Sequence, residues 1–327
     1  MQPARRSFQL FFRFLFCTFA LLQKRKILNK AIRIGTRGSK LALWQAEYTR
    51  AQLLEKGVES ELVIIQTKGD KIQDLSFDKI EGKGFFTKEI EDALLQGEVD
   101  MAAHSMKDMP TTSPEGLVIT ALSYRENPAD WLLIRKDTID KSALFGLKNG
   151  AVVGTSSARR KAQMLDFRGD IQLRDLRGNV PTRVEKLRRG DYDAILLAAA
   201  GLQRLEMDLS EFELVRFNPR EFVPAPAQGV VAWQTRTDDL PTRRLLQSIH
   251  QADVAAVTNI ERGILKLMGG GCHLPLGAYC ERDSQGNYHV WAAKADRWDA
   301  PLRRAHLSSS TSFELAERVV ALLDEKK

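Results

Sequence analysis

Two distant segments of the chain follow the same course from a short apolar strand through a Gly-Thr turn into a helix. They are IRIGTRGSKLALW at residues 32–44 and AVVGTSSARRKAQML at residues 151–165. A second pair, residues 97–108 and 190–204, runs from a glycine through an aspartate into an apolar strand and a polar loop. Alternating strands and helices predict parallel α/β sheets. The two pairs indicate two related halves, although their unequal spacing excludes a regular repeat.

The remaining elements follow from local patterns. In the helix expected at residues 41–57, Leu41, Trp44 and Tyr48 recur at helical spacing. From about Gln251 the sequence predicts a helix, a glycine-rich loop, two strands around YHVWAAKA and a closing helix that starts at a capping box beginning with Thr311. The expected fold class is α/β, with two similar halves and a smaller α/β unit at the C-terminal end.

The excess positive charge of the chain lies at its start. Residues 1–30 hold seven Lys or Arg and no acid, and the other residues hold 42 basic and 42 acidic side chains. A broad nucleic-acid-binding face is therefore disfavoured. Residues 1–30 place an apolar run between basic flanks, but Arg13 interrupts it and it is shorter than the about 20 residues that span a bilayer. We expect an extension outside the fold, without stable membrane insertion; a targeting segment is the alternative.

Cysteine usage indicates a reducing, cytoplasmic compartment. The three cysteines, Cys17, Cys272 and Cys280, show no C-x-x-C spacing, so they predict neither a disulfide framework nor a structural zinc site. The five histidines form no metal-binding motif, and we expect no metal. Cys272 lies in the loop GGGCHLPLG, where it is either a reactive thiol or a small buried hydrophobe.

Arginines gather at the expected strand-to-helix turns, where the free amides and the dipole of a helix start favour anions. Singly, each is most simply a solvated surface charge. Together they predict a site for several carboxylates, because neither a G-x-G-x-x-G nor a G-x-x-x-x-G-K-[ST] motif favours nucleotide phosphates. The residues at these turns are Arg37, Ser39, Ser157, Arg159, Arg160, Arg177, Arg183 and Arg204.

Two further polar loops are candidates. HSMKDMP follows an apolar strand and places Ser105, Lys107 and Asp108 at a strand end, where a lone carboxylate among arginines suits a reaction that develops positive charge. An ordinary polar loop is the alternative. FDKIEGKGFFTKE brings Lys79 and Lys83, either on a mobile lid or on a solvated loop.

Taken in order, the motifs resemble the porphobilinogen deaminase family over residues 31–327. The segments that carry the resemblance are IRIGTRGSKLALWQA, GKGFFTKE, AAHSMKDMP, VGTSSARRKAQ, LRGNVPTR, YDAILLAAAGLQRL, PAPAQG and GGGCHLPLG. The resemblance implies two lobes like those of periplasmic binding proteins and a third domain that bears the cofactor cysteine. The implied boundaries are residues 31–123 with 229–246, residues 129–222, and residues 252–327.

The resemblance also implies a reaction. Four porphobilinogen molecules are joined head to tail into the linear tetrapyrrole hydroxymethylbilane, with loss of ammonia at each step, in tetrapyrrole (haem) biosynthesis by a monomeric transferase. A dipyrromethane cofactor is attached through a thioether to Cys272. Asp108 matches the catalytic aspartate. Matched cofactor-binding positions are Arg159, Arg160, Arg177, Arg183, Ser157, Lys107 and Ser105, and matched substrate-binding positions are Arg37, Ser39, Arg204, Lys83 and Lys79.

Four positions depart from the family pattern. Gly269 replaces an acid, Ala227 replaces a glycine, Gln234 replaces another acid, and Glu81 replaces the first glycine of the GGKG loop. They leave the thiol, the aspartate and the arginines in place but could alter loop mobility or rate. A non-catalytic solute-binding protein is the alternative function, since it would need the arginine-lined cleft but not Cys272.

Overall fold

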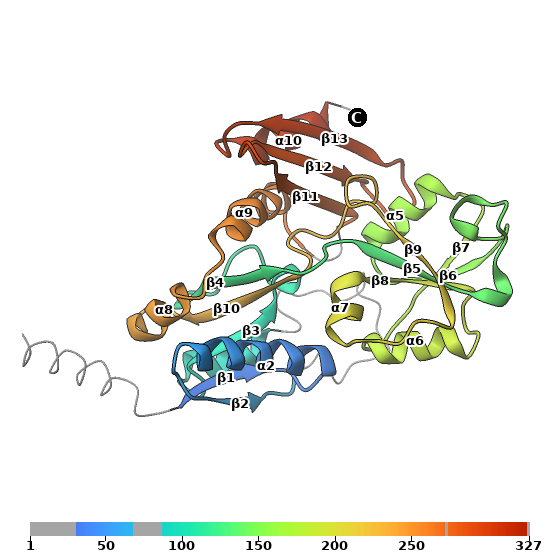
Figure 1. The fold of residues 1–327 in the computed structure, drawn as a ribbon. Coiled ribbons are helices and arrows are strands. Elements are labelled where there is room, and N and C mark those ends of the chain that lie inside the picture. The colour runs from blue at the N-terminus through green and yellow to red at the C-terminus, as the bar shows by residue number, and fades with distance from the viewer. Residues whose placement is uncertain (1–30, 68–86, 272–273, 326–327) are drawn as a thin grey trace, which may run out of the picture.

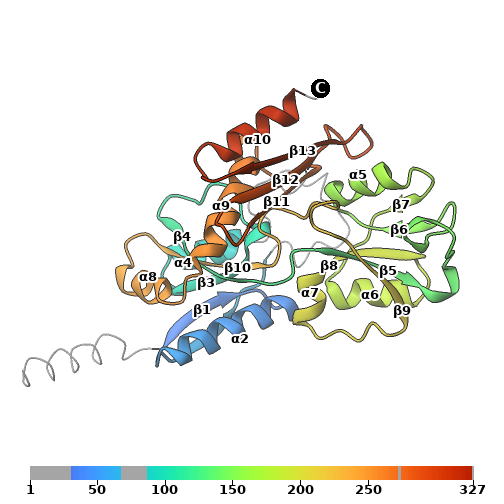
Figure 2. The ribbon, with the colours of Figure 1, turned by 45° about the horizontal axis from the view of Figure 1, so that its top comes forward.

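The computed structural model describes residues 31–67, 87–271 and 274–325. Within these residues the chain forms two lobes, each built on its own β-sheet, and a smaller third unit that lies against both (Figure 1). Turning the molecule shows the third unit above the region where the lobes meet (Figure 2). The predicted positions Lys79, Lys83 and Cys272, and the departure at Glu81, lie outside the described residues.

Lobe 1 contains a sheet with strand order β2-β1-β3-β10-β4. Its elements are β1 (Ile32–Thr36), α2 (Lys40–Glu55), β2 (Ser60–Ile64), α4 (Lys88–Leu95), β3 (Met101–Ser105), the 3-10 turn η2 (Met106–Asp108), β4 (Leu117–Arg125), β10 (Val230–Arg236) and α8 (Leu240–Gln247). α2 and α8 cover one face of the sheet and α4 covers the other. The central strand β3 is therefore buried on both sides, which its apolar sequence requires.

Lobe 2 contains a sheet with strand order β7-β6-β8-β5-β9. Its elements are β5 (Asp130–Arg135), the 3-10 turns η3 (Lys136–Thr138) and η4 (Leu144–Gly146), β6 (Val152–Gly154), α5 (Ala158–Phe167), β7 (Gln172–Arg174), α6 (Val180–Arg188), β8 (Ala194–Ala198), α7 (Ala199–Arg204) and β9 (Phe212–Arg216). Alternate residues of β8 enter different cores. Ile195 and Leu197 pack with α6 and α7, whereas Leu196 packs with α5 on the opposite face.

The two sheets share one topology. Strands β2, β1 and β3 are parallel and β10 pairs antiparallel with β3; in lobe 2, β7, β6 and β8 are parallel and β5 pairs antiparallel with β8. The strands of the two echoing sequence pairs occupy equivalent places, β1 with β6 and β3 with β8. The prediction of two related α/β halves is confirmed.

The first strand-to-helix turn of each lobe is built alike. Ser39 caps α2 by accepting a hydrogen bond from the amide of Ala42, and Ser157 caps α5 by accepting one from the amide of Arg160, both at 3.4 Å. Asn179 caps α6 in the same manner, with Pro181 in its first turn. Each of these serines thus starts the helix that follows a strand end.

Two segments connect the lobes, one from β4 to β5 and one from β9 to β10. The amide of Glu126 donates to the carbonyl of Gly229 at 2.9 Å, where the segments meet. Gly229 has a φ of 91°, and a Cβ there would lie 2.3 Å from the carbonyl oxygen of Glu126. Only glycine fits this crossing. The residue boundaries of the three domains stay a prediction.

The third unit contains β11 (Leu276–Arg282), β12 (Tyr288–Lys294) and β13 (Arg303–Ser309) in an antiparallel sheet, with α9 (Ala252–Leu267) and α10 (Leu315–Asp324) packed on one face. The sequence predicted the first two strands but missed β13. Its segment RRAHLSS turns only Ala305 and Leu307 toward the helices, so its apolar pattern is weak. The smaller α/β unit is confirmed, which completes the expected fold class.

One local prediction was wrong. No capping box starts α10: the residue before the helix is Glu314, which has a left-handed φ of 50° and makes no side-chain cap. In α2 the buried face runs through Ala42, Ala46 and Leu53. The helix itself was predicted correctly: Tyr48 packs against the lobe 1 core, and Trp44 contacts Arg204 of lobe 2.

Candidate active site

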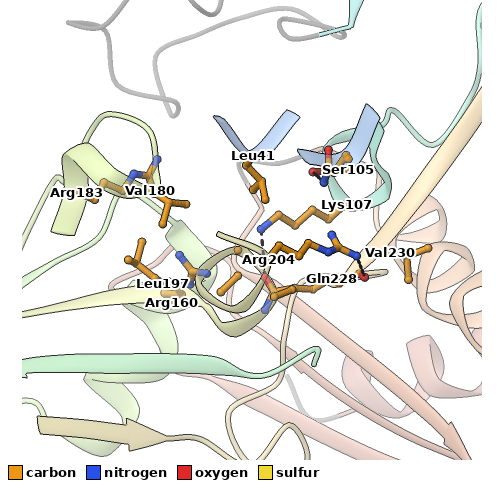
Figure 3. A pocket seen from close by; sticks show the side chains of 15 residues that line it. Leu41, Ser105, Lys107, Arg160, Val180, Arg183, Leu197, Arg204, Gln228 and Val230 are labelled. Carbon is orange, nitrogen blue, oxygen red and sulfur yellow. Dashed lines mark hydrogen bonds between the residues drawn. The ribbon is translucent and has the colours of Figure 1, made fainter. Parts of the chain in front are cut away.

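A pocket lies between the lobes beside the C-terminal ends of β3 and β8 (Figure 3). Ligands of open α/β sheets bind at such strand ends. Its lining includes Ser105, Lys107, Arg160, Arg183 and Arg204, all predicted from the sequence. Side chains that are distant in the chain, on both lobes, therefore converge on one pocket, and the charged ones among these five are cations.

The lobe 1 wall holds Ser105 and Lys107 through amide side chains. Gln45 of α2 donates a 2.8 Å hydrogen bond to the hydroxyl of Ser105, and Lys107 donates to the side-chain oxygen of Gln228 at 3.4 Å (Figure 3). Burial lowers the pKa of Lys107, and the charge of nearby Asp108 opposes this shift. The ammonium is oriented by a neutral partner, so its charge remains available to an anion.

The lobe 2 wall is organised around a carboxylate that the sequence patterns did not reveal. Asp130, fully buried, accepts a 2.7 Å hydrogen bond from Arg159 through one oxygen and bonds of 2.7 and 3.1 Å from Arg160 through the other. Burial alone would raise the pKa of Asp130, but the charges and hydrogen bonds of Arg159 and Arg160 outweigh it and hold the pKa well below its usual range. Arg160 lines the pocket, whereas Arg159 lies outside its lining and also donates to the carbonyl of Val223.

Arg183 extends this wall from α6. Its Nε donates to the carbonyl of Gly178 at 2.6 Å. Burial, together with the like charges of Arg160 and Arg177, lowers the pKa of Arg183 to about 10, while the charge of Asp108 opposes the shift. Arg183 therefore stays protonated at neutral pH. The exposed carboxylate on η2 of lobe 1 therefore acts electrostatically on Arg183 of lobe 2.

Arg204 joins the two lobes. Its Nη2 donates to the carbonyl of Gly229 at 2.7 Å, and its guanidinium carbon lies 5.1 Å from the ring centroid of Trp44 on α2. The Trp44 ring stacks on Tyr48 with centroids 5.6 Å apart. This cation–π contact fixes α7 against α2 at the pocket.

Other predicted residues lie near the pocket without lining it. Arg37 follows β1, and its charge adds to the effect of burial, which lowers the pKa of His104 on β3 to about 4. Ser39 and Ser157 are the helix caps described above. Arg177 is coupled electrostatically to Arg183. These residues follow β1, β6 and β7, three of the other parallel strands of the two sheets.

Three polar residues of the site were missed. Asp130 could have been suspected because it starts the apolar strand WLLI, and a buried carboxylate needs cationic partners. Gln45 gave no signal inside a helix pattern. Gln228 occurred in the motif PAPAQG, but its role emerges only from its hydrogen bonds to Lys107 and to Asp130, the latter 3.0 Å long.

Three of the departures from the family pattern lie within the described residues. Ala227 adopts a left-handed φ of 61°, where glycine would be unstrained. The buried Gln234 donates to Glu91 at 3.1 Å. An ionised acid at position 234 could not make this bond. Gly269, with a φ of 91°, follows α9 in a conformation that suits glycine.

Comparisons with known proteins show which proteins this chain is similar to. Residues 32–244 match the family model described as porphobilinogen deaminase, dipyromethane cofactor binding domain. The porphobilinogen deaminase of Chloroherpeton thalassium is 41% identical over 89% of this chain and 92% of its own length, and that of Maridesulfovibrio salexigens is 45% identical over 78% and 82%. The periplasmic VFT2 domain of Bordetella pertussis BvgS, at 13% identity and a TM-score of 0.40, covers 71% of this chain and 93% of its own. This chain belongs to the porphobilinogen deaminase family.

Proposed function

We infer that the chain condenses four porphobilinogen molecules head to tail into hydroxymethylbilane, with release of ammonia. It is a transferase of tetrapyrrole, and hence haem, biosynthesis, and its cofactor is dipyrromethane. The observation that carries this function is the convergence of Lys107, Arg160, Arg183 and Arg204 on one pocket. Each pyrrole unit bears two carboxylates, so a growing chain of such units is a polyanion that these cations would bind.

The residues present fit the cofactor. The guanidinium of Arg160 is held by Asp130 on one side and lines the pocket on the other. It is therefore already oriented to bind a carboxylate of the cofactor. We propose Cys272, outside the described residues, as the thioether attachment point. When bound, the cofactor supplies the pyrrole end to which the first substrate unit is joined. The residues that we propose to hold it are Arg159, Arg160, Arg177, Arg183, Ser157, Lys107 and Ser105.

Arg159 acts through its neighbours in this proposal. It lies outside the pocket lining, and one of its nitrogens donates to both Asp130 and the carbonyl of Val223. Its contribution is therefore to neutralise and orient Asp130, which in turn orients Arg160. Arg160 contacts a ligand carboxylate directly.

Asp108 is the proposed catalytic residue. Its carboxylate is exposed on η2, and its charge acts on Arg183 across the space between the lobes. As ammonia leaves porphobilinogen, positive charge develops on the pyrrole, and a carboxylate that accepts a hydrogen bond from the pyrrole N–H stabilises that charge. The surrounding arginines orient the substrate through its acetate and propionate groups.

Substrate binding is assigned to residues around the same opening. We propose that Arg37, Ser39, Arg204, Lys83 and Lys79 bind incoming porphobilinogen. Arg37 and Ser39 occupy the first strand-to-helix turn of lobe 1, and Arg204 lines the pocket from lobe 2. The two lysines lie outside the described residues and stay predictions from the sequence.

We also propose a monomer that acts in the cytoplasm without a nucleic-acid partner. The support is the equal number of acids and bases beyond residue 30 and the absence of disulfide-forming cysteine spacing in the sequence. No helix in residues 31–67, 87–271 and 274–325 is long and apolar enough to cross a membrane. Sedimentation of the purified chain would test the oligomeric state.

The reaction itself is tested by its stoichiometry. Purified protein incubated with porphobilinogen is expected to release four ammonia molecules for each linear tetrapyrrole formed, because each unit loses one amino group. Ammonia and tetrapyrrole are measured in the same sample. Binding of porphobilinogen without release of ammonia would contradict the proposed function and favour a solute-binding protein.

A further inference from the structure

An arginine of the third unit forms hydrogen bonds to the backbone of the turn that bears Asp108. Arg262 of α9 donates through Nη1 to the carbonyl oxygens of Met106 and Met109, at 3.1 and 3.2 Å, and through Nη2 to that of Pro110, at 2.6 Å. Arg262 is 9% exposed. One guanidinium thus binds three carbonyls that flank Asp108 on both sides.

Met106 and Met109 pack in a buried cluster and Lys107 bonds to Gln228, but the backbone of the turn is weakly bonded within itself. η2 is three residues long, and its backbone bond from the amide of Met109 to the carbonyl of Met106 is 3.2 Å. Ser105 makes no side-chain cap to it. Short 3-10 turns have poor hydrogen-bond geometry, whereas bonds from a charged donor are roughly twice as strong as neutral ones. Among these contacts, Arg262 is the one that holds the backbone carbonyls on both sides of Asp108.

The far end of α9 approaches the same segment. After the helix ends at Leu267, the amide of Gly270 donates to the carbonyl of Leu265 at 2.8 Å. Gly270 has a φ of 58°, and a Cβ there would lie 2.8 Å from the hydroxyl oxygen of Thr111. The glycine segment that leads to position 272 therefore passes directly against the residue after Pro110.

α9 is itself fixed to lobe 1. The residue before Arg262, Glu261, accepts hydrogen bonds of 2.6 and 3.1 Å from Arg125 of β4 and one of 2.7 Å from the amide of Ala227. These bonds hold α9 in a fixed position relative to the lobe 1 sheet, and η2 follows β3 of that sheet. α9 therefore sets the position of both the glycine segment and η2.

We propose that Arg262 is a positioning residue for the condensation: it holds the Asp108 carboxylate in place relative to the end of α9, from which the cysteine loop leaves. The proposal rests on the role proposed for Asp108. It assigns Arg262 no contact with substrate. A merely structural role, as one more bond between the third unit and lobe 1, is the competing explanation.

The first test compares Arg262→Gln and Arg262→Lys with the control Arg304→Gln. Arg304 joins the third unit to Asp166 of lobe 2 at 2.9 Å and does not touch η2. We expect Arg262→Gln to keep the cofactor mass and to lower kcat about a hundredfold with less than a threefold change in KM, as small misplacements of reacting groups do. Arg262→Lys should recover part of kcat, and Arg304→Gln should stay within twofold.

Amide hydrogen exchange gives a readout independent of activity. Without the hydrogen bonds of Arg262, the amides of residues 106–111 should exchange at least tenfold faster in Arg262→Gln. The exchange of the same amides in the control should not change. Unchanged exchange in Arg262→Gln would overturn the proposal, as would a protein purified without its cofactor mass, which would indicate a role in assembly.

A double-mutant cycle separates positioning from general stabilisation. Asp108→Glu keeps the charge but moves it by one methylene. If Arg262 acts through Asp108, adding Arg262→Gln to Asp108→Glu should lower kcat less than threefold further. A further hundredfold loss would overturn the proposal. Normal kcat in Asp108→Glu alone would show that the carboxylate tolerates displacement by one methylene and would overturn the positioning proposal. Near-normal kcat in Asp108→Asn would instead refute the role of Asp108, and the exchange rates would still report whether Arg262 holds the turn.

Discussion

The two lobes place different chemistry on the same scaffold. At the end of β3, lobe 1 presents Lys107 and the exposed Asp108; at the equivalent end of β8, lobe 2 presents the helix that ends in Arg204. After the first strand of the βαβ unit, lobe 1 has Arg37, whereas lobe 2 has Arg159 and Arg160 around a buried carboxylate. The shared strand topology therefore does not determine which lobe binds anions.

The lobes differ in the sign and the burial of the charges that they present at the pocket. At the pocket wall of lobe 2, the buried guanidinium groups of Arg159 and Arg160 share a single carboxylate, Asp130, so this wall keeps a net positive charge for a polyanion. Lobe 1 leaves Asp108 exposed at the opening, where it can respond to positive charge that develops on the substrate. We infer that lobe 2 holds the growing chain and lobe 1 performs the chemistry.

The largest effect is expected from the charge centre of lobe 2. Asp130→Asn would leave Arg159 and Arg160 buried without their counter-charge, which typically costs about 3–5 kcal/mol. Urea unfolding measures the loss. The control Asp191→Asn removes an exposed carboxylate of the same lobe, paired with Arg189, and should cost about 1 kcal/mol or less. Equal losses would mean that Asp130 is no special centre of lobe 2.

The same carboxylate predicts a pH dependence. Because the folded-state pKa of Asp130 lies below its unfolded value, its stabilisation is present above about pH 4 and is lost as pH falls toward the lowered pKa. The free energy of unfolding of Asp130→Asn should therefore fall less steeply below pH 4 than that of the unmodified chain. Parallel curves would contradict the assigned pKa shift.

The next effect falls on lobe 1. Asp108→Asn keeps the shape of the side chain but removes the charge that stabilises the developing cation, so turnover should fall about a hundredfold, or on the order of 3 kcal/mol. Unfolding stability should be nearly unchanged because Asp108 is exposed. Asp92→Asn, an exposed change on α4, should keep normal turnover. Near-normal turnover in Asp108→Asn would remove it from the mechanism.

Substitutions of arginines in the two lobes should impair different stages, cofactor loading for lobe 2 and processing of porphobilinogen for lobe 1. Arg160→Leu, at the pocket, is expected to yield protein without cofactor mass, whereas Arg37→Leu should remain loaded and process porphobilinogen about tenfold to a hundredfold more slowly, the effect of losing one charged hydrogen bond. Arg159→Leu should also lose loading, through Asp130 and Arg160. Intact mass spectrometry decides between these outcomes, and equal loading in all three variants would remove the distinction between the lobes.

The smallest effect concerns the contact between the lobes. Trp44→Leu removes the aromatic face over which Arg204 lies, a contact of about 1 kcal/mol. KM for porphobilinogen should rise about fivefold with kcat almost unchanged, because Arg204 keeps its bond to Gly229. A loss of kcat with unchanged KM would instead place this contact in the chemical step.

Local sequence patterns predicted much of this arrangement. The Gly-Thr-Ser turns are strand ends followed by capped helices, and the echoing segments occupy equivalent strands, because period and capping are local properties. The arginines at these turns could be chosen because strand ends are where ligands bind. Arg160, Arg183 and Arg204 indeed share one pocket.

Other features depend on contacts across long sequence separations. Asp130 lies about thirty residues from its arginines, and no local pattern pairs them. The spacing of Trp44 predicted its helix but not its contact with Arg204 of the other lobe. β13 was missed because one of its faces is polar. In each case the partner, rather than the segment itself, determines the role.

Intact mass spectrometry of the unmodified chain and of Cys272→Ser tests most directly the central claim that the lobes hold a chain anchored on this thiol. The unmodified protein should be heavier than its sequence by two porphobilinogen units less two ammonias. Cys272→Ser should lack that mass and be inactive, because a hydroxyl is a far poorer nucleophile than a thiolate, while Cys17→Ser and Cys280→Ser keep both mass and activity. An active Cys272→Ser protein of unmodified mass would contradict the claim.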